Sequence, residues 1–229
     1  MKAFLVILTA IILMAAQGWI QELAGIAVLP ARSFTDGPSS GQSIQPAIGI
    51  HPPFVNQQPV QGLSALLYRE GRWLSITDNG FGSQKNSSDY KLRVIELEPD
   101  FRSQTRGTGQ LSVTTLFTVC DPLRQIRFPV VADRKFYPGS DIPFATEIRQ
   151  RRCLTEADLD IESFQRTADG SYWFGDEFGP FLLHTDGHGI VLEPPVPIPR
   201  VMAPENPFLA NEPPLMGSPP VRAVPAIVA

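Results

Sequence analysis

The sequence has few of the residues that build a zinc site. Among 229 residues there are only two cysteines and three histidines. No Cys-x-x-Cys pair occurs, and His51, His184 and His188 are all distant in sequence from Cys120 and Cys153. Structural zinc sites take four closely grouped cysteine and histidine ligands. The sequence therefore gives no indication of a zinc protein.

Excess positive charge is also absent. The 19 lysines and arginines are outnumbered by 23 aspartates and glutamates, for a net charge of −4. This excludes the electrostatic footprint of a nucleic-acid-binding protein. The segment Gly80–Lys85 lacks the spacing of a phosphate-binding P-loop, and no Gly-x-Ser-x-Gly elbow of a serine hydrolase occurs.

Long amphipathic helices are missing. From Gly62 onward no ten-residue stretch has helical periodicity, whereas short β-branched and aromatic runs recur. The 23 prolines and 18 glycines indicate many turns. We therefore expect a mostly β protein.

One apolar run stands at the N-terminus. It extends from Ala3 to Ala16 after Lys2 and ends in Ala16-Gln17-Gly18. Its length of about 14 residues fits a signal peptide better than a membrane span, which needs about 20. We expect a signal peptide over residues 1–18, an exported protein (periplasmic or extracellular) and no stable membrane span after cleavage. An uncleaved anchor through Trp19 and Ile20 is the alternative.

Export would allow the two cysteines to form a disulfide. A Cys120–Cys153 bond would close a loop of about 34 residues and stabilise the fold by roughly 3–4 kcal/mol. The alternative is two unpaired thiols. The segment between them is rich in proline, and we expect an irregular insert over residues 120–157.

Carboxylates are concentrated in one hairpin, from Asp158 to Pro180. The first strand alternates acidic with apolar residues, and Asp169-Gly170 supplies the turn. Tyr172–Phe174 is expected to form the second, antiparallel strand. Besides Asp169 in the turn, the acidic residues are Asp158, Asp160, Glu162, Asp176 and Glu177. Carboxylates this close repel one another and usually require a cation or solvent.

Two alternatives accompany this interpretation. The acids could be solvated turn residues or could bind backbone amides, and Asp78 fits a turn before Asn79-Gly80 best. Thr155 to Asp158 could form a capping box that opens a short helix, which would remove Asp158 from any site.

A weak repeat links this hairpin to an earlier one over Gly62–Gly80 with a Glu70-Gly71 turn. When the two segments are aligned with Gly71 against Gly170, Asp78 aligns with Glu177. With one residue inserted before the second turn, Ser64 aligns with Glu162. Further strands are expected over residues 92–97 and 111–119 after the first hairpin, and over 181–185 and 190–192 after the second. Tandem four-stranded antiparallel units are typical of β-propeller blades.

Several of these segments carry a family resemblance. They are Gly62-Leu-Ser-Ala-Leu, Ile76-Thr-Asp-Asn-Gly, Asp158–Phe164, Asp169–Leu183 and Pro195-Val-Pro-Ile-Pro. Over residues 62–211 the chain resembles the phytase-like family, "esterase-like activity of phytase". The resemblance implies a β-propeller-like, often exported protein whose recurring acids carry phosphoester hydrolysis.

The expected site combines both hairpins. Asp160, Glu162 and Glu177 are the candidate catalytic residues, and the same three with Asp78 are the candidate ligands of a divalent cation, for which calcium is expected. The expected substrate is a small-molecule phosphoester. A non-catalytic propeller fragment or binding module, and a calcium-dependent hydrolase of another small-molecule class, remain alternatives.

The expected organisation is a signal peptide (1–18), an N-terminal strand near 25–29 followed by a loop (19–61), the blades (62–195) and a Pro-rich tail (196–229). Propellers close with four to eight blades, and two are found here. We therefore expect an incomplete propeller, a truncated member with little phosphodiesterase activity as this chain. The oligomeric state is not predicted.

Overall fold

The computed structural model describes residues 22–60, 62–78 and 80–208. The expected signal peptide therefore lies outside the described residues, as does the end of the Pro-rich tail. The chain divides into two compact units, one of Met1–Val28 with Pro99–Leu111 and one of Leu29–Glu98 with Ser112–Ala229.

The described part of the smaller unit is held by two isolated backbone bridges. Ile26 pairs antiparallel with Arg102, and Val28 pairs in parallel with Gln110. A continuous strand over residues 25–29 was expected, and that expectation is wrong. The two pairings run in opposite directions, so the segment cannot extend one regular ladder.

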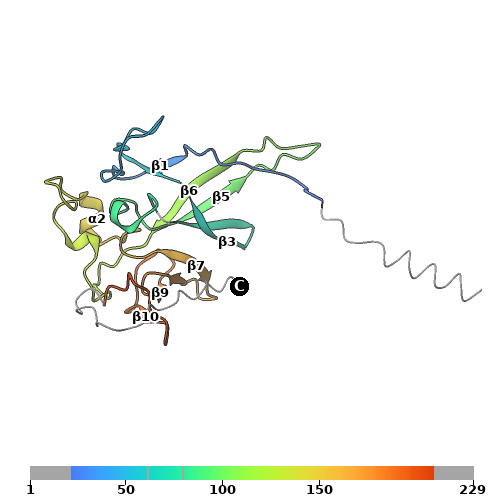
Figure 1. Cartoon of the computed structure of the whole chain (residues 1–229). Coiled ribbons are helices and arrows are strands. Elements are labelled where there is room, and N and C mark those ends of the chain that lie inside the picture. Colours follow the sequence, from blue (N-terminus) through green and yellow to red (C-terminus); the bar gives the residue numbers. More distant parts are fainter. Residues whose placement is uncertain (1–21, 61, 79, 209–229) are drawn as a thin grey trace, which may run out of the picture. The chain divides into compact units, whose positions relative to one another are not determined.

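The first four-stranded sheet belongs mainly to the larger unit. Its strands are β3 (Leu63–Arg69), β4 (Arg72–Thr77), β5 (Arg93–Pro99) and β6 (Leu111–Thr118), in the order β3-β4-β5-β6 (Figure 1). Glu70 and Gly71 join β3 to β4 with φ values of 54° and 80°. Two positive φ values in a two-residue hairpin loop match the right-handed twist of the strands. The predicted strands and turn are confirmed.

The second sheet has the order β10-β9-β8-β7. Its strands are β7 (Ile161–Arg166), β8 (Tyr172–Asp176), β9 (Phe181–Thr185) and β10 (Val196–Pro197). The fourth strand was expected over residues 190–192 and lies instead at β10. This segment is shared between two partners. The Gly189 carbonyl accepts from the Cys120 amide, and the Val191 amide donates to the Cys120 carbonyl, outside this sheet. Beside β9 there remain only an isolated bridge between Val191 and Thr185 and a hydrogen bond from the Leu192 amide to the His184 carbonyl.

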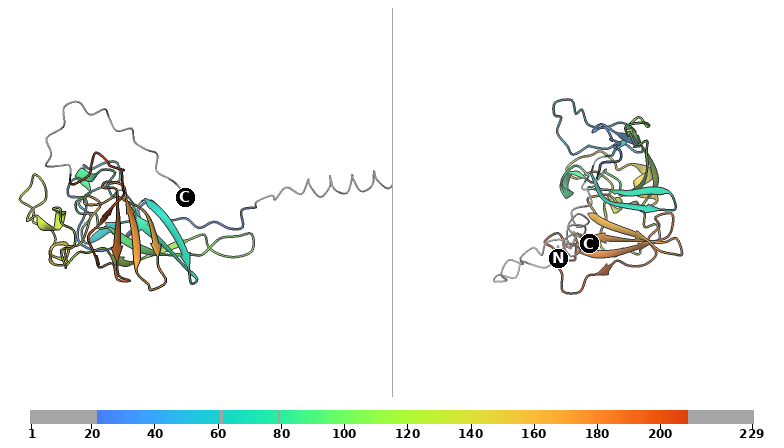
Figure 2. Two further views of the ribbon diagram at one scale, coloured as in Figure 1. Left: turned by 90° about the horizontal axis from the view of Figure 1, so that it is seen from below. Right: turned by 90° about the vertical axis from the view of Figure 1, so that its right-hand side faces the viewer.

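Strands β3 and β7, each at the edge of its sheet, lie next to one another (Figure 2). Apolar side chains of both sheets form one core cluster. It includes Leu74, Ile76 and Val94 from the first sheet and Phe164, Phe174 and Leu183 from the second. Burial of this shared apolar surface fixes the two hairpins side by side.

The insert between the sheets contains the predicted disulfide, Cys120–Cys153. It also contains η2 (Val131–Asp133) and α2 (Thr146–Gln150), with α2 the longest helix in the described part of the chain. Arg152, which follows α2 in the chain, is buried and pairs with Asp121 and Asp133. The insert is therefore irregular but well bonded.

Two short strands lie in the segment that was expected to be a loop. β1 (Phe34–Asp36) and β2 (Gln57–Pro59) pair antiparallel. Gln58 is fully buried and bonds the backbone of Asp89 and Lys91. A polar residue with several backbone partners anchors this pair, which hydrophobic periodicity does not detect. A short η1 (Gln84–Asn86) follows β4.

The fold is all-β with antiparallel sheets, as predicted. Each sheet is a four-stranded meander, the unit from which propeller blades are built, while a closed propeller stays a prediction. None of the described helices has the length and apolar character required to cross a membrane.

Candidate metal and catalytic site

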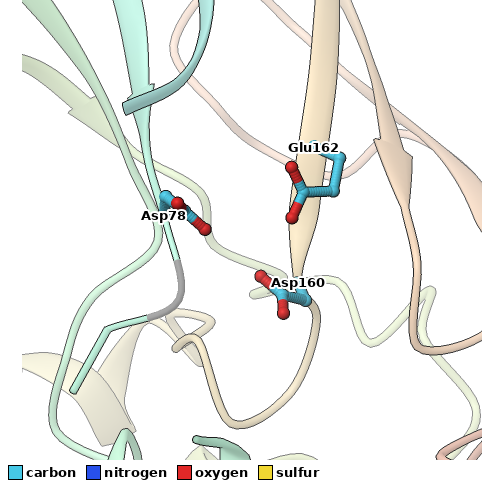
Figure 3. Close-up of side chains that lie close together, drawn as sticks. All are labelled: Asp78, Asp160 and Glu162. Carbon is cyan, nitrogen blue, oxygen red and sulfur yellow. The ribbon is translucent and has the colours of Figure 1, made fainter. Parts of the chain in front are cut away.

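Three carboxylates from the two sheets converge (Figure 3). Asp78 follows the end of β4, Asp160 directly precedes β7, and Glu162 lies within β7. One ligand atom from each lies within 4.8 Å of the other two. Residues 78 and 160 are far apart in sequence, and the shared core of the sheets brings them together.

Local irregularities shape both sides of this cluster. The ladder between β3 and β4 shifts register between Leu63 and Leu66, and that between β7 and β8 shifts between Ile161 and Ser163. The shifts fall at Ser64 and Glu162, the positions equated by the sequence repeat. Such bulges re-aim side chains and are frequent beside active sites.

Gly62 allows the close approach of β3 to Asp78. It has φ +65°, and an added Cβ would lie 3.0 Å from the Asp78 Cβ and 3.1 Å from its Oδ2. A larger residue would therefore displace the Asp78 side chain. The Oγ of Ser64 is buried here.

Asp160 is the buried member of the cluster, with 2% of its surface exposed. Its backbone is fixed on both sides: its amide donates to Asp176 Oδ1 at 2.9 Å, and its carbonyl accepts from the Glu177 amide at 2.9 Å. Its own Oδ1, like Oδ1 of Asp78, is buried without a partner in the described part of the chain. Buried polar atoms are almost always bonded, so these two oxygens could accept a proton or bind a cation.

Burial raises the pKa of Asp160 to about 7, and the negative charges of Glu177, Glu162, Asp78 and Asp176 add to the rise. The pKa of Glu162 is also raised, first by burial and then by Asp78 and Glu177, against the opposing effect of the Ser64 hydroxyl. Within the described ranges, none of the three clustered carboxylates forms an ion pair. A proton or a cation is needed to balance them.

A fourth carboxylate, Glu156, was missed by the sequence reasoning. It is 1% exposed, and its Oε1 accepts a hydrogen bond from Thr77 Oγ1 at 2.9 Å. Burial raises its pKa well above the ordinary value, with further increases from the charges of Asp160 and Asp78. The sequence signal was weak, because Glu156 lies in a turn and was considered only as part of a capping box.

Asp158 lies outside the cluster. Its Oδ1 accepts from the Val131 amide at 2.6 Å, and its Oδ2 accepts from the amide and hydroxyl of Thr155 at 2.8 and 3.0 Å. The segment forms a turn, so the predicted acidic strand beginning at Asp158 is wrong, and β7 begins at Ile161. The alternative that Asp158 serves backbone capping is confirmed, without the helix.

Glu177 is exposed and is not one of the three clustered residues. Its charge nevertheless ranks directly after burial among the causes of the raised Asp160 pKa. Asp176 has a structural position instead, because its carboxylate accepts from the amides of Asp160, Phe178 and Gly179.

His184 lies away from the acidic cluster on β9. Its Nδ1 is 2.8 Å from Glu193 Oε1, and its Nε2 is 3.0 Å from Ser171 Oγ. Ser171 is also bonded through both its amide and its hydroxyl to Asp169. The arrangement is a satisfied network at the hairpin turn, in which the Ser171 amide is not free to bind an oxyanion.

The structure thus defines an all-β protein of antiparallel meanders with a carboxylate cluster at the junction of two sheets. The family model for phytase-like proteins, described as "esterase-like activity of phytase", matches residues 58–212. The chain belongs to this family. Neither the curated proteins nor the solved structures contain a match.

Proposed function

We propose that the protein is a cation-dependent phosphoester hydrolase of the phytase-like family. The observation that carries this proposal is the buried Asp160, whose Oδ1 has no hydrogen-bond partner among the described residues, while ligand atoms of Asp78 and Glu162 lie within 4.8 Å. Membership of a family described by phytase esterase activity supports the reaction class.

The donor set favours calcium. Carboxylate oxygens suit hard cations, and calcium accepts six to eight oxygen ligands with flexible geometry. Magnesium is usually held by one or two carboxylates and keeps several waters. Asp78, Asp160 and Glu162 would hold the ion.

A cation at this position supplies Lewis-acid polarisation of a phosphoryl oxygen and offsets the charge of the phosphate group. The residues of the chain supply the rest. Asp160 stays rigid because its amide and carbonyl are both bonded. Glu177 is exposed and is not one of the three clustered ligands, so we assign proton exchange with water to it. Without the cation, the clustered negative charge would repel a phosphate anion.

The substrate class follows from this charge balance. A small phosphodiester or a phytate-like phosphomonoester carries negative charge that the cation would neutralise. The Cys120–Cys153 disulfide supports an exported protein, since disulfides persist in oxidising compartments.

Calcium-dependent turnover tests the proposal. Purified protein would be assayed with bis-p-nitrophenyl phosphate in EDTA and in calcium, beside Asp160→Asn, which keeps the side-chain size. We expect low turnover, in keeping with the little phosphodiesterase activity expected from the sequence. This turnover should require calcium and fall at least about 100-fold in the variant, because the ligand set loses a charge. Calcium binding without turnover would instead favour a binding module, and equal turnover in EDTA would refute cation dependence.

A further inference from the structure

Glu156 is a buried carboxylate that the surrounding protein only half satisfies. Its Oε1 accepts from Thr77, but its Oε2 is buried and has no hydrogen-bond partner in the described part of the chain. No ion pair within 4.0 Å compensates its charge among those residues. A buried, unpaired carboxylate is costly unless a proton or a cation neutralises it.

The backbone and side chain of Glu156 are both held next to the segment that carries Asp78. Its amide donates to the Tyr90 carbonyl at 3.0 Å, and its carboxylate is bonded to Thr77, the residue directly before Asp78. Gly80 permits this packing, because a Cβ there would lie 3.2 Å from the Glu156 Cβ. The turn therefore holds the Glu156 side chain against the segment that carries Asp78.

Arg93 is a buried cation whose charge acts on Glu156. Its guanidinium nevertheless forms no ion pair within 4.0 Å with the Glu156 carboxylate in the described part of the chain. Its guanidinium donates to Thr35 Oγ1, the Pro59 carbonyl and the Lys91 carbonyl, all neutral acceptors. Its positive charge lowers the pKa of Glu156 by Coulomb attraction. The carboxylate therefore remains available to a cation on the side of Asp78 and Asp160.

We propose that Glu156 is the fourth carboxylate of the cation site and supplies the charge behind Asp78 and Asp160. This inference rests on the proposed function, because it requires that the cluster binds a cation. Four carboxylates give the site a charge of about −4 against +2 for calcium, a combination that strengthens binding of a flexible, many-coordinate ion. The unpartnered oxygens of Asp78, Glu156 and Asp160 then have a common ligand.

Glu156→Gln tests the role of the charge, because glutamine keeps the size and can still accept from Thr77. Calcium affinity would be measured by calorimetry at pH 8, and unfolding temperature in EDTA and in calcium. We expect the affinity to fall about 10–100-fold, as for other supporting residues of metal sites. We also expect the unfolding temperature in EDTA to rise, because a buried repulsive charge is removed. A purely structural role predicts a fall in EDTA and unchanged affinity, which would overturn the inference.

Two further variants distinguish a failure of this inference from a failure of the proposed function. Glu147→Gln removes an exposed acid paired with Lys91 and should bind calcium as the wild type does. Glu162→Gln should weaken binding. If the wild type binds no calcium, the proposed function fails. If Glu162→Gln weakens binding and Glu156→Gln does not, only the role of Glu156 fails.

A wild-type measurement covers the case in which Glu156→Gln does not fold. In a calcium-loaded crystal structure we expect a Glu156 oxygen either at about 2.3–2.6 Å from the ion or joined to it through one water. A Glu156 carboxylate with neither contact would overturn the inference.

Discussion

The carboxylate of Asp176 holds the backbone amide of Asp160 at 2.9 Å and thereby places the central acid of the cluster. The same carboxylate accepts from the Gly179 amide at 2.7 Å. Asp176→Asn should cost about 1–3 kcal/mol of unfolding free energy, because buried amides lose a charged acceptor. It should also weaken calcium binding, since Asp160 loses its support. Urea unfolding and calorimetry check the two effects.

Asp186→Asn is the matched control for this prediction. Like Asp176, Asp186 accepts hydrogen bonds from backbone amides at a turn. Its donors are the amides of His188 and Ile190, at 2.8 and 2.9 Å. It lies at the other end of β9 from Phe181, away from the cluster. Its loss should reduce stability but leave calcium affinity unchanged. Equal loss of affinity in both variants would contradict a specific positioning role for Asp176.

Stability without cation should fall as pH rises from about 5 to 8. The folded-state pKa values of Asp158, Asp160 and Asp176 are raised from 3.8 to about 6, 7 and 6, chiefly by burial. A group with a raised folded pKa contributes stability that is complete below its unfolded pKa and is lost as pH rises through the folded value. Unfolding temperature in EDTA across this window checks the direction.

Calcium should reverse this loss. Binding requires deprotonated ligands, so the increase in unfolding temperature caused by calcium should grow between pH 5 and 8. Asp160→Asn should both flatten the pH dependence in EDTA and abolish the calcium effect. A calcium effect that is equal at pH 5 and pH 8 would argue against carboxylate ligands with raised pKa values.

The Cys120–Cys153 bond should stabilise the fold by roughly 3–4 kcal/mol, as estimated for a closed loop of this length. Both cysteines are buried. Native protein should show no labelling by a thiol reagent, and the double variant Cys120→Ser/Cys153→Ser should unfold at lower urea concentration. Two reactive thiols in the native protein would contradict the pairing.

Arg152 anchors the same insert. It pairs with the fully buried Asp121 and with Asp133, and it also donates to the carbonyls of Ile126 and Phe128. Arg152→Ala should cost about 3–5 kcal/mol, because the Asp121 charge would be left buried and unpaired. The adjacent Arg151 is exposed, so Arg151→Ala should cost less than about 0.5 kcal/mol. Comparable losses of unfolding free energy in the two variants would contradict the anchoring role of Arg152.

Local pattern was enough to predict the hairpins. Glu70-Gly71 and Asp169-Gly170 are turn dipeptides with strong backbone preferences, and β-branched and aromatic runs flank them. The internal repeat then related Asp78 and Ser64 of one hairpin to Glu177 and Glu162 of the other. Asp78, Asp160 and Glu162 lie close together, whereas Glu177 lies outside the three. That these acids bind a cation stays a prediction.

What the sequence could not provide depends on contacts across the fold. Glu156 is buried only because its turn packs against the Tyr90 backbone and Thr77. Asp158 is diverted from the acidic strand by the Val131 amide, which lies in the insert. Alternation of acidic and apolar residues suggested a strand from Asp158, and the preference of its carboxylate for a distant amide overrode that pattern.

The most direct measurement is an anomalous-difference map from crystals loaded with terbium, a lanthanide that replaces calcium at oxygen sites. We expect a single strong peak bonded to oxygens of Asp78, Asp160 and Glu162, at distances of about 2.3–2.6 Å. The peak should be lost when crystals of Asp160→Asn are treated in the same way. Terbium-soaked crystals with no peak between these three carboxylates would contradict the proposed cation site.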